Sequence, residues 1–165
     1  MTENQTERLV QRMYCLTLYN LSPIQQGIQS AHAIVEYASV FGQTQEYVNW
    51  AGLDKTIIIL NGGSSIKLKE NMDYLIDNQL IDLAFFREPD LFNGITACCF
   101  LADERIWNRE KYPDKLMPLE SPNIGGGVEG TLAIHRVFDE SAFIDRIGGF
   151  KNFQLKLFLE KFRLA

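Results

Sequence analysis

A strand, a tight turn and a helix follow one another near the start of the chain, and this unit constrains the fold more than any other stretch. An apolar run from Met13 to Tyr19 comes first. Ser22 then has the character of a helix N-cap, and Pro23 stands at the first helical position, where its missing N–H is not needed. Gln25 falls three residues after Ser22, which is the spacing of a capping box. The pattern therefore predicts a buried strand followed directly by a helix over 23–40.

Two stripes run along this helix when it is wound at 100° per residue. One stripe is apolar and contains small residues, so we expect it to approach a sheet closely. Its members are Ile24, Ile28, Ala31, Val35 and Ala38. The other stripe is polar and lies beside it, and its members are Gln25, Gln29, His32 and Glu36. A polar stripe next to a buried face is either a site or the boundary between core and solvent.

The rest of the first two thirds of the chain extends this unit into an α/β sheet. A β-branched run at 55–60 predicts a second buried strand, and apolar runs at 81–86 and 95–101 predict two more. Helical patterns at 43–51 and 66–78 lie between them. Strands that alternate with helices make a small sheet with helices on both faces, and crossover connections make its first pairings parallel. We therefore expect a three-layer α/β/α core.

The chain changes character after residue 104. Residues 105–130 are polar and contain three prolines and a Gly-Gly-Gly run, and a connection of that length is usually functional or mobile. Residues 131–138 could form an edge strand, and helices are expected at 140–147 and 150–164, hinged at two glycines. The domain prediction is a flexible tail at 1–10, a core at 11–104 and an extension at 105–165 that packs on the core.

The composition argues against several classes of protein. No apolar run approaches the roughly 20 residues that a membrane span needs, and the polar, acidic N-terminus does not resemble a signal peptide. The three cysteines, of which Cys98 and Cys99 are adjacent in an apolar run, make neither a disulfide framework nor a zinc site. With two histidines in the chain, we expect no metal site. These features predict a cytoplasmic protein with reduced core cysteines and no membrane association.

Charge is unevenly distributed along a chain whose formal net charge is −5. Residues 1–104 carry 13 acidic and 6 basic side chains, whereas residues 105–165 carry 10 basic and 8 acidic ones. Attraction for a nucleic acid must therefore come mainly from the second part. Lys151 and Lys156 are the candidates for contact with RNA, although the same lysines are also consistent with a solvated helix face.

The candidates for chemistry are carboxylates near strand ends. The chain has no Gly-x-Ser-x-Gly elbow and no cysteine with an obvious histidine base. Glu88 and Asp90 lie in the loop between the last two core strands, and ligands of open α/β sheets collect beyond such strand ends. A carboxylate there can orient or deprotonate a water for ester hydrolysis. The alternative is that both residues only shape the turn around Pro89.

The segment Gln29-Ser30-Ala31-His32-Ala33, after a capped strand–helix turn, resembles the alanine-glutamine-x-x-histidine-alanine signature of class II peptidyl-tRNA hydrolases. The stretch from Trp50 to Lys55 before an apolar strand is similar to that family as well. The resemblance covers about residues 12–103. It implies a four-stranded mixed sheet between helices, often a homodimer, no cofactor, and hydrolysis of the ester that joins a peptide to the 3′ end of tRNA.

The carry-over of catalytic residues from this family is incomplete. The family's catalytic aspartate falls on Glu88, which keeps the negative charge on a longer side chain. Its lysine, four residues before the signature glutamine, falls on Gln25, which brings no positive charge for a phosphate or a developing oxyanion. The family's glycine-basic-threonine turn is replaced by the shorter segment 89–94, and the next hydroxyl belongs to Thr96.

The resemblance implies a site in which Glu88 is the water-orienting base and Gln25 a polar clamp. The other implied binding residues are Gln29, His32, Asp90, Asn93 and Thr96. The leading hypothesis is a divergent peptidyl-tRNA hydrolase with peptidyl-tRNA as its partner. The alternative is a non-catalytic member of the fold that binds a nucleotide, an RNA end or a protein in the same cleft. A third possibility is a scaffold that assembles through residues 105–165.

Overall fold

The strand near the start of the chain lies inside a four-stranded sheet in the computed structural model, which describes residues 8–113 and 140–165. In chain order the strands are β1 (Gln11–Leu18), β2 (Thr56–Gly63), β3 (Leu83–Glu88) and β4 (Gly94–Asp103). Their order across the sheet is β2-β1-β4-β3. β1 pairs in parallel with β2 and antiparallel with β4, and β3 pairs antiparallel with β4. The sheet is therefore mixed, as the resemblance implied.

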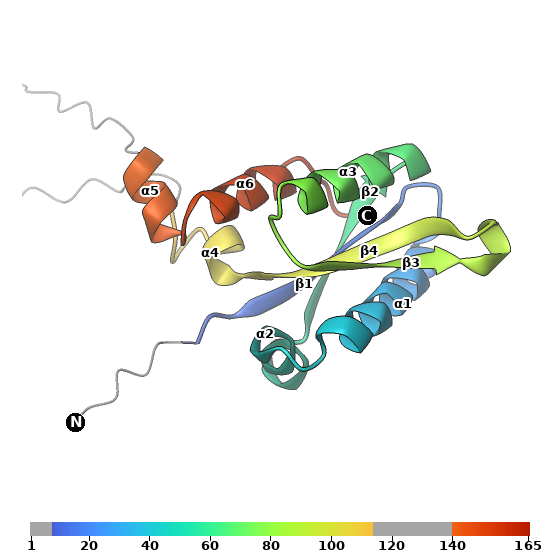
Figure 1. Ribbon diagram of the computed structural model, residues 1–165, viewed down its shortest axis with the longest axis horizontal. Helices are drawn as coiled ribbons and strands as arrows, with labels where there is room; N and C mark the ends of the chain where they lie inside the picture. The colour runs from blue at the N-terminus through green and yellow to red at the C-terminus, as the bar shows by residue number, and fades with distance from the viewer. Residues whose placement is uncertain (1–7, 114–139) are drawn as a thin grey trace, which may run out of the picture.

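Helices cover both sides of this sheet (Figure 1). One side carries the helices of the first half of the chain, α1 (Pro23–Phe41) and α2 (Gln45–Asn49), followed by a π-helical turn at Trp50–Asp54. The other side carries α3 (Ser65–Asp77), α4 (Glu104–Trp107) and α6 (Phe150–Leu159), with α5 (Glu140–Arg146) leading into α6. The expected layers, with helices on both faces of the sheet, are confirmed.

The start of α1 has the capping box that the sequence indicates. The Ser22 hydroxyl accepts a hydrogen bond from the backbone N–H of Gln25 at 3.3 Å, and the Gln25 side-chain oxygen accepts one from the backbone N–H of Ser22 at 3.0 Å. Pro23 stands in the first turn, where no donor is lost. Gly42 closes the other end by donating to the carbonyl of Ala38 at 2.9 Å.

The prediction of which face of α1 packs on the sheet is wrong. The apolar stripe points to solvent: Ile24, Ile28 and Val35 are 78%, 48% and 64% exposed. The buried residues lie about half a turn away, and they are Gln26, Gln29, Ser30, Ala33 and Tyr37. Small side chains on this face permit close packing, and the buried amides of Gln26 and Gln29 form hydrogen bonds, so their burial is compensated.

The two faces of β1 and β4 contribute to two separate hydrophobic clusters. The cluster under α3 and α6 contains Leu16, Leu68, Phe100 and Phe158, all of them almost fully buried. The cluster under α1 contains Met13, Cys15, Tyr37 and Cys99. All three cysteines are free and buried, which confirms them as core residues. Burial raises the pKa of the Cys98 thiol, and the hydrogen bond with Cys15, together with burial, raises that of Cys99.

The described part of the C-terminal extension packs on the core. Leu155 and Phe158 of α6 belong to the cluster under α3, and Leu164 forms an antiparallel bridge with Leu60 at the edge of β2. Gly148 and Gly149 have φ values of +90° and +108°, which confirms the expected hinge between two helices. The strand expected at 131–138 lies outside the described residues. No helix within 8–113 or 140–165 is long and apolar enough to cross a membrane.

Candidate functional site

Three predicted site residues form a continuous hydrogen-bonded chain between α1 and the β3–β4 hairpin. The Thr96 hydroxyl donates to Gln29 Oε1 at 2.5 Å, and Gln29 Nε2 donates to Glu88 Oε2 at 2.6 Å. Gln29 and Thr96 are buried, whereas Glu88 is half-buried. Because Thr96 occupies the amide oxygen, the amide nitrogen of Gln29 must face the carboxylate. These two hydrogen bonds therefore fix one oxygen of Glu88 at the surface of the protein.

An irregularity in the sheet brings Thr96 into this chain. Phe86 pairs with Ala97, but the next residue, Arg87, pairs with Ile95, so the register passes over Thr96. A β-bulge of this kind inserts one extra residue into a strand and re-aims its side chain. The hydroxyl of Thr96, which is only 1% exposed, consequently reaches Gln29 on α1.

His32 lies one turn beyond Gln29 on α1 and stacks on β3. Its ring is 4.4 Å from the Phe86 ring, centroid to centroid, at an interplanar angle of 15°. His32 itself is exposed. The imidazole therefore covers Phe86 beside the Gln29–Glu88 hydrogen bond.

The other predicted site residues near Glu88 lie around the Thr96–Gln29–Glu88 hydrogen-bonded chain and are not part of it. The Gln25 amide serves the capping box, as described above. Asp90 is exposed in the short 3-10 helix at Pro89–Leu91 that forms the tip of the β3–β4 hairpin. Asn93 has a φ of +56°, and its backbone carbonyl accepts a hydrogen bond from Arg87 at 3.1 Å. Asp90 and Asn93 thus shape the turn in this structure.

A pocket of about 370 Å³ lies next to Thr96, where parallel strands β1 and β2 end. Its walls come from the ends of β1 and β2, the start of α3 and the hairpin, and they include Tyr19, Asn20, Ser64, Ser65 and Leu91. Ligands of α/β sheets collect at such carboxyl ends. Glu88 is not among the residues that line this pocket, so Thr96 is the link between the pocket and the carboxylate.

The two lysines proposed to contact RNA differ in exposure. Lys151 is exposed near the start of α6. Lys156 is only 6% exposed, and its ammonium group donates to the backbone carbonyl of Ile106 at 3.3 Å and lies 3.5 Å from the Glu160 carboxylate. The structure therefore places Lys156 in the packing between α4 and α6, and only Lys151 of this pair is presented to solvent.

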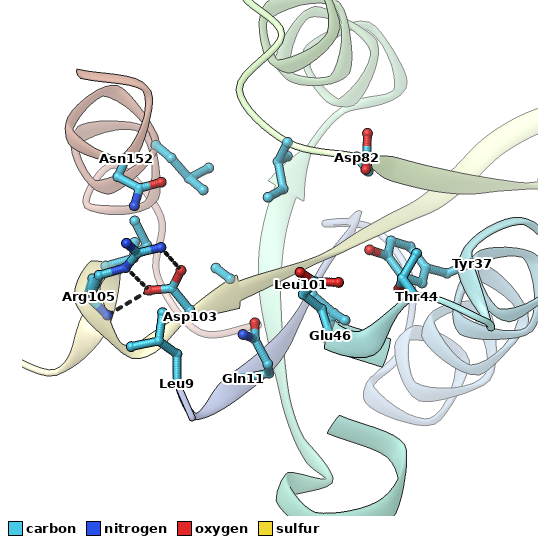
Figure 2. A pocket seen from close by; sticks show the side chains of 14 residues that line it. Leu9, Gln11, Tyr37, Thr44, Glu46, Asp82, Leu101, Asp103, Arg105 and Asn152 are labelled. Carbon is cyan, nitrogen blue, oxygen red and sulfur yellow. Dashed lines mark hydrogen bonds and ion pairs between the residues drawn. The ribbon is translucent and has the colours of Figure 1, made fainter. Parts of the chain in front are cut away.

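A second cavity, of about 290 Å³, lies at the opposite end of the sheet (Figure 2). Thr96 and Asp103, which mark the two ends, are seven residues apart along β4, roughly 23 Å. The cavity is lined from β1, β4, α1, α2, α4 and α6, and its polar residues are Gln11, Tyr37, Thr44, Glu46, Asp82, Asp103, Arg105 and Asn152. Sequence reasoning missed it, because no local motif marks a cavity that many distant segments share.

Charge inside this cavity is mostly negative. Arg105 forms two side-chain hydrogen bonds with Asp103, at 2.7 and 2.9 Å, so these two charges offset each other. The side chains of Glu46 and Asp82, which are both exposed, form no hydrogen bond or ion pair within residues 8–113 and 140–165. Burial and the nearby Asp82 and Glu46 carboxylates raise the pKa of the Tyr37 hydroxyl, as a negative potential requires.

The chain thus defines an α/β protein with a four-stranded mixed sheet and polar sites at both ends of that sheet. No model of a known protein family matches the chain. A search of curated proteins likewise gives no significant match. The side chains of the sites themselves therefore carry the information about function.

Proposed function

We propose that the Thr96–Gln29–Glu88 end of the sheet hydrolyses an ester of the peptidyl-tRNA type, with Glu88 as the general base. The observation that carries this proposal is the hydrogen-bonded chain, which holds one oxygen of Glu88 at 2.6 Å from Gln29. The described residues supply no other hydrogen bond or ion pair to this carboxylate. Its second oxygen is therefore available to accept a proton from water.

The proposed reaction uses this geometry. Glu88 accepts a proton from water while the water oxygen attacks the ester carbonyl carbon. The bond from that carbon to the ribose oxygen of the tRNA then breaks, and the leaving oxygen takes up a proton, which Glu88 can return. The products are a tRNA with a 3′-terminal hydroxyl and a peptide carboxylic acid, which releases its proton to solvent and becomes the carboxylate. Gln29 and Thr96 do not react, because their part is to orient the base.

Donors for the developing oxyanion must come from hydroxyl, amide or backbone N–H groups in this arrangement. The pocket beside Thr96 is lined by such groups, including Asn20, Ser64 and Ser65. Neutral donors aimed at a developing charge can supply several kcal/mol, roughly 3 or 4 for a well-placed one. They would replace the lysine of the resembling family, whose position is held here by the helix-capping Gln25.

A non-catalytic binding protein is the second candidate, and one observation favours it. Gln25 is engaged in the capping box, and within residues 8–113 and 140–165 no lysine or arginine forms an ion pair with Glu88. The same pocket would then hold a nucleotide, an RNA end or a protein segment without cleaving it. Turnover separates the two candidates directly.

The decisive experiment measures the cleavage of a purified N-blocked aminoacyl-tRNA by the full chain and by Glu88→Gln. We expect Glu88→Gln to lower the rate about 10²–10⁴-fold while the protein stays folded, because a positioned base contributes about that much. Glu36→Gln is the matched control. It removes the same charge from an exposed residue of α1 and should keep the parent rate.

Each result of this experiment is informative. Turnover that depends on Glu88 supports the hydrolase and makes the donors around Thr96 the next question. Full activity of Glu88→Gln contradicts the assigned base. Tight tRNA binding without turnover favours the binding protein, and the absence of both rejects peptidyl-tRNA as the partner of this end of the sheet.

A further inference from the structure

The outer face of α1 is apolar although it points to solvent. Apolar side chains follow one another along it, and all but the last are exposed: Ile24, Ile28, Ala31, Val35 and the half-buried Ala38. We call this set the α1 seam. The opposite face of α1 is buried on the sheet, and the described residues leave the seam uncovered. Contiguous exposed apolar surface of this kind commonly marks an interaction site.

The exposed face of α3, on the other side of the sheet, has the ordinary character of a solvent-facing helix (Figure 1). Two ion pairs lie along it, Lys67–Glu70 at 3.0 Å and Lys69–Asp73 at 2.6 Å. α1 is longer than α3, but Glu36 is the only Asp, Glu, Lys or Arg in its sequence, and the seam itself has none. In a chain whose formal net charge is −5, this uncharged face is therefore a surface on which a second copy meets little repulsion.

The spacing of the seam matches the contact pattern of two helices that pack side by side. Its residues follow one another in steps of four, three, four and three positions, which is the repeat of a coiled-coil contact. The repeat covers roughly 21 Å of α1, from Ile24 to Ala38. A seam of this kind is self-complementary, because each side chain fits between those of an identical helix.

An antiparallel pairing of two copies fits the seam best. It places Ile28 of each copy opposite Ala31 of the other, so that a large side chain meets a small one at the centre of the contact. Ile24 then lies opposite Val35 at both ends. A parallel pairing would put Ala31 opposite Ala31 and leave a gap, and it would also bring the positive ends of the two helix dipoles together.

From these observations we propose that α1 is the interface of a two-fold symmetric homodimer, in which the seams of two copies pack antiparallel. A contact as wide as one helix and roughly 21 Å long is smaller than the about 800 Å² per partner of a standard interface. We therefore expect a weak dimer, with a Kd of about 10–100 µM. The proposal does not depend on hydrolysis at Glu88, because the seam contains no residue of the Thr96–Gln29–Glu88 chain.

The first test is analytical ultracentrifugation of the full chain from about 1 µM to about 1 mM. We expect an equilibrium between one and two copies that goes no further, because a two-fold contact is closed. Raising the salt concentration should leave the dimer as strong as before or strengthen it, since no charges meet in the seam. A chain that stays monomeric throughout this range overturns the proposal and assigns the seam to another partner. Association beyond two copies overturns it as well.

The second test uses a matched pair of variants, Val35→Glu and Ile66→Glu. Val35 lies in the seam and is 64% exposed, whereas Ile66 lies on α3 and is 72% exposed. Each change puts one carboxylate on an exposed helix position. Val35→Glu should weaken dimerisation about tenfold or more, because the charge would be buried without a partner. Ile66→Glu should change the Kd by less than about twofold. Equal weakening by both would make net charge the cause and would reject the seam.

The third test measures a gain of association, so it cannot be explained by a variant that fails to fold. Ile24→Lys and Val35→Glu should each dimerise poorly alone. An equimolar mixture should recover a dimer within about threefold of the parent Kd, because the antiparallel pairing brings the two new charges of opposite sign face to face. In a parallel pairing these positions lie eleven residues apart and do not meet. A mixture that associates no better than either variant alone would reject the antiparallel seam.

Discussion

The two ends of the sheet treat the same kind of side chain in opposite ways. Gln29, at one end, has both atoms of its amide engaged, with Thr96 at 2.5 Å and Glu88 at 2.6 Å. Gln11, at the other end, is as deeply buried, but within the described residues its amide has no partner. A saturated amide rigidifies its surroundings, whereas the Gln11 amide lines a cavity and holds no second segment of the described chain in place. Substitutions at the two ends of the sheet test this contrast.

Gln29→Leu should destabilise the protein by about 1–3 kcal/mol, because it strands the buried Thr96 hydroxyl and releases Glu88. Urea unfolding measures the change. The double variant with Thr96→Val should lose much less than the sum of the two single losses, since both changes break the same chain. If the two losses of free energy of unfolding were strictly additive, Gln29 and Thr96 would not form the hydrogen bond seen in the structure.

Gln25→Ala tests a neighbouring amide that only caps the start of α1 in this structure. It should lower the free energy of unfolding by about 0.5–1 kcal/mol, through loss of one half of the capping box. Thermal unfolding followed by circular dichroism is sufficient to detect it. A drop in ester hydrolysis far beyond the loss of folded protein would show that Gln25 also acts in the site.

Gln11→Leu is the counterpart of Gln29→Leu at the other end of the sheet. Here the same substitution removes an amide that faces the cavity and has no partner in the described residues, so we expect stability to stay within about 0.5 kcal/mol of the parent. Urea unfolding under the conditions used for Gln29→Leu makes the two values comparable. A loss as large as that of Gln29→Leu would mean that Gln11 is satisfied in solution and would remove the contrast.

The smallest effect concerns Asp54, which anchors the Gln11 end. The hydrogen bonds from Arg8, at 2.8 and 2.9 Å, and from the Gln11 backbone lower its pKa from the ordinary value of 3.8. A lowered pKa means that Asp54 stabilises the fold above about pH 4 and that this contribution is lost as pH falls further. Melting temperatures of the parent and Asp54→Asn should therefore differ at neutral pH, and the difference should shrink as the pH falls below about 4. A gap that is independent of pH would contradict the ion pair as its source.

The sequence predicts the elements of this fold well and the packing of α1 poorly. Ser22, Pro23 and Gln25 mark the start of α1 because capping is a local interaction. Which face of α1 meets the sheet depends on what lies opposite. Gln29 can be buried only because Thr96 and Glu88, at least 59 residues away, supply its hydrogen bonds. The hydrophobic periodicity of a helix does not show which partners lie opposite it. The prediction that the stripe through Ile28 and Val35 packs on the sheet is wrong for this reason.

The two candidate sites differ in the same respect. The residues around Glu88 were found from the sequence because they follow a short motif and a loop between two strands. The bulge that turns Thr96 toward α1 has no local signature. The cavity at the other end joins Gln11, Glu46, Asp82 and Asp103 from four separate parts of the chain. Each of these residues is unremarkable in its own segment, and only the topology of the sheet brings them together.

The three buried cysteines give the molecule an internal reporter. Cys15 on β1 pairs in register with Cys99 on β4, midway between the two polar ends. Their neighbourhood raises the pKa of the Cys98 and Cys99 thiols, and only thiolates react with alkylating reagents. Labelling at these positions therefore requires the helices to leave the sheet or β1 and β4 to separate. The rate of alkylation would therefore measure how often the centre of the sheet opens, and it would not respond to fraying at the ends of the sheet.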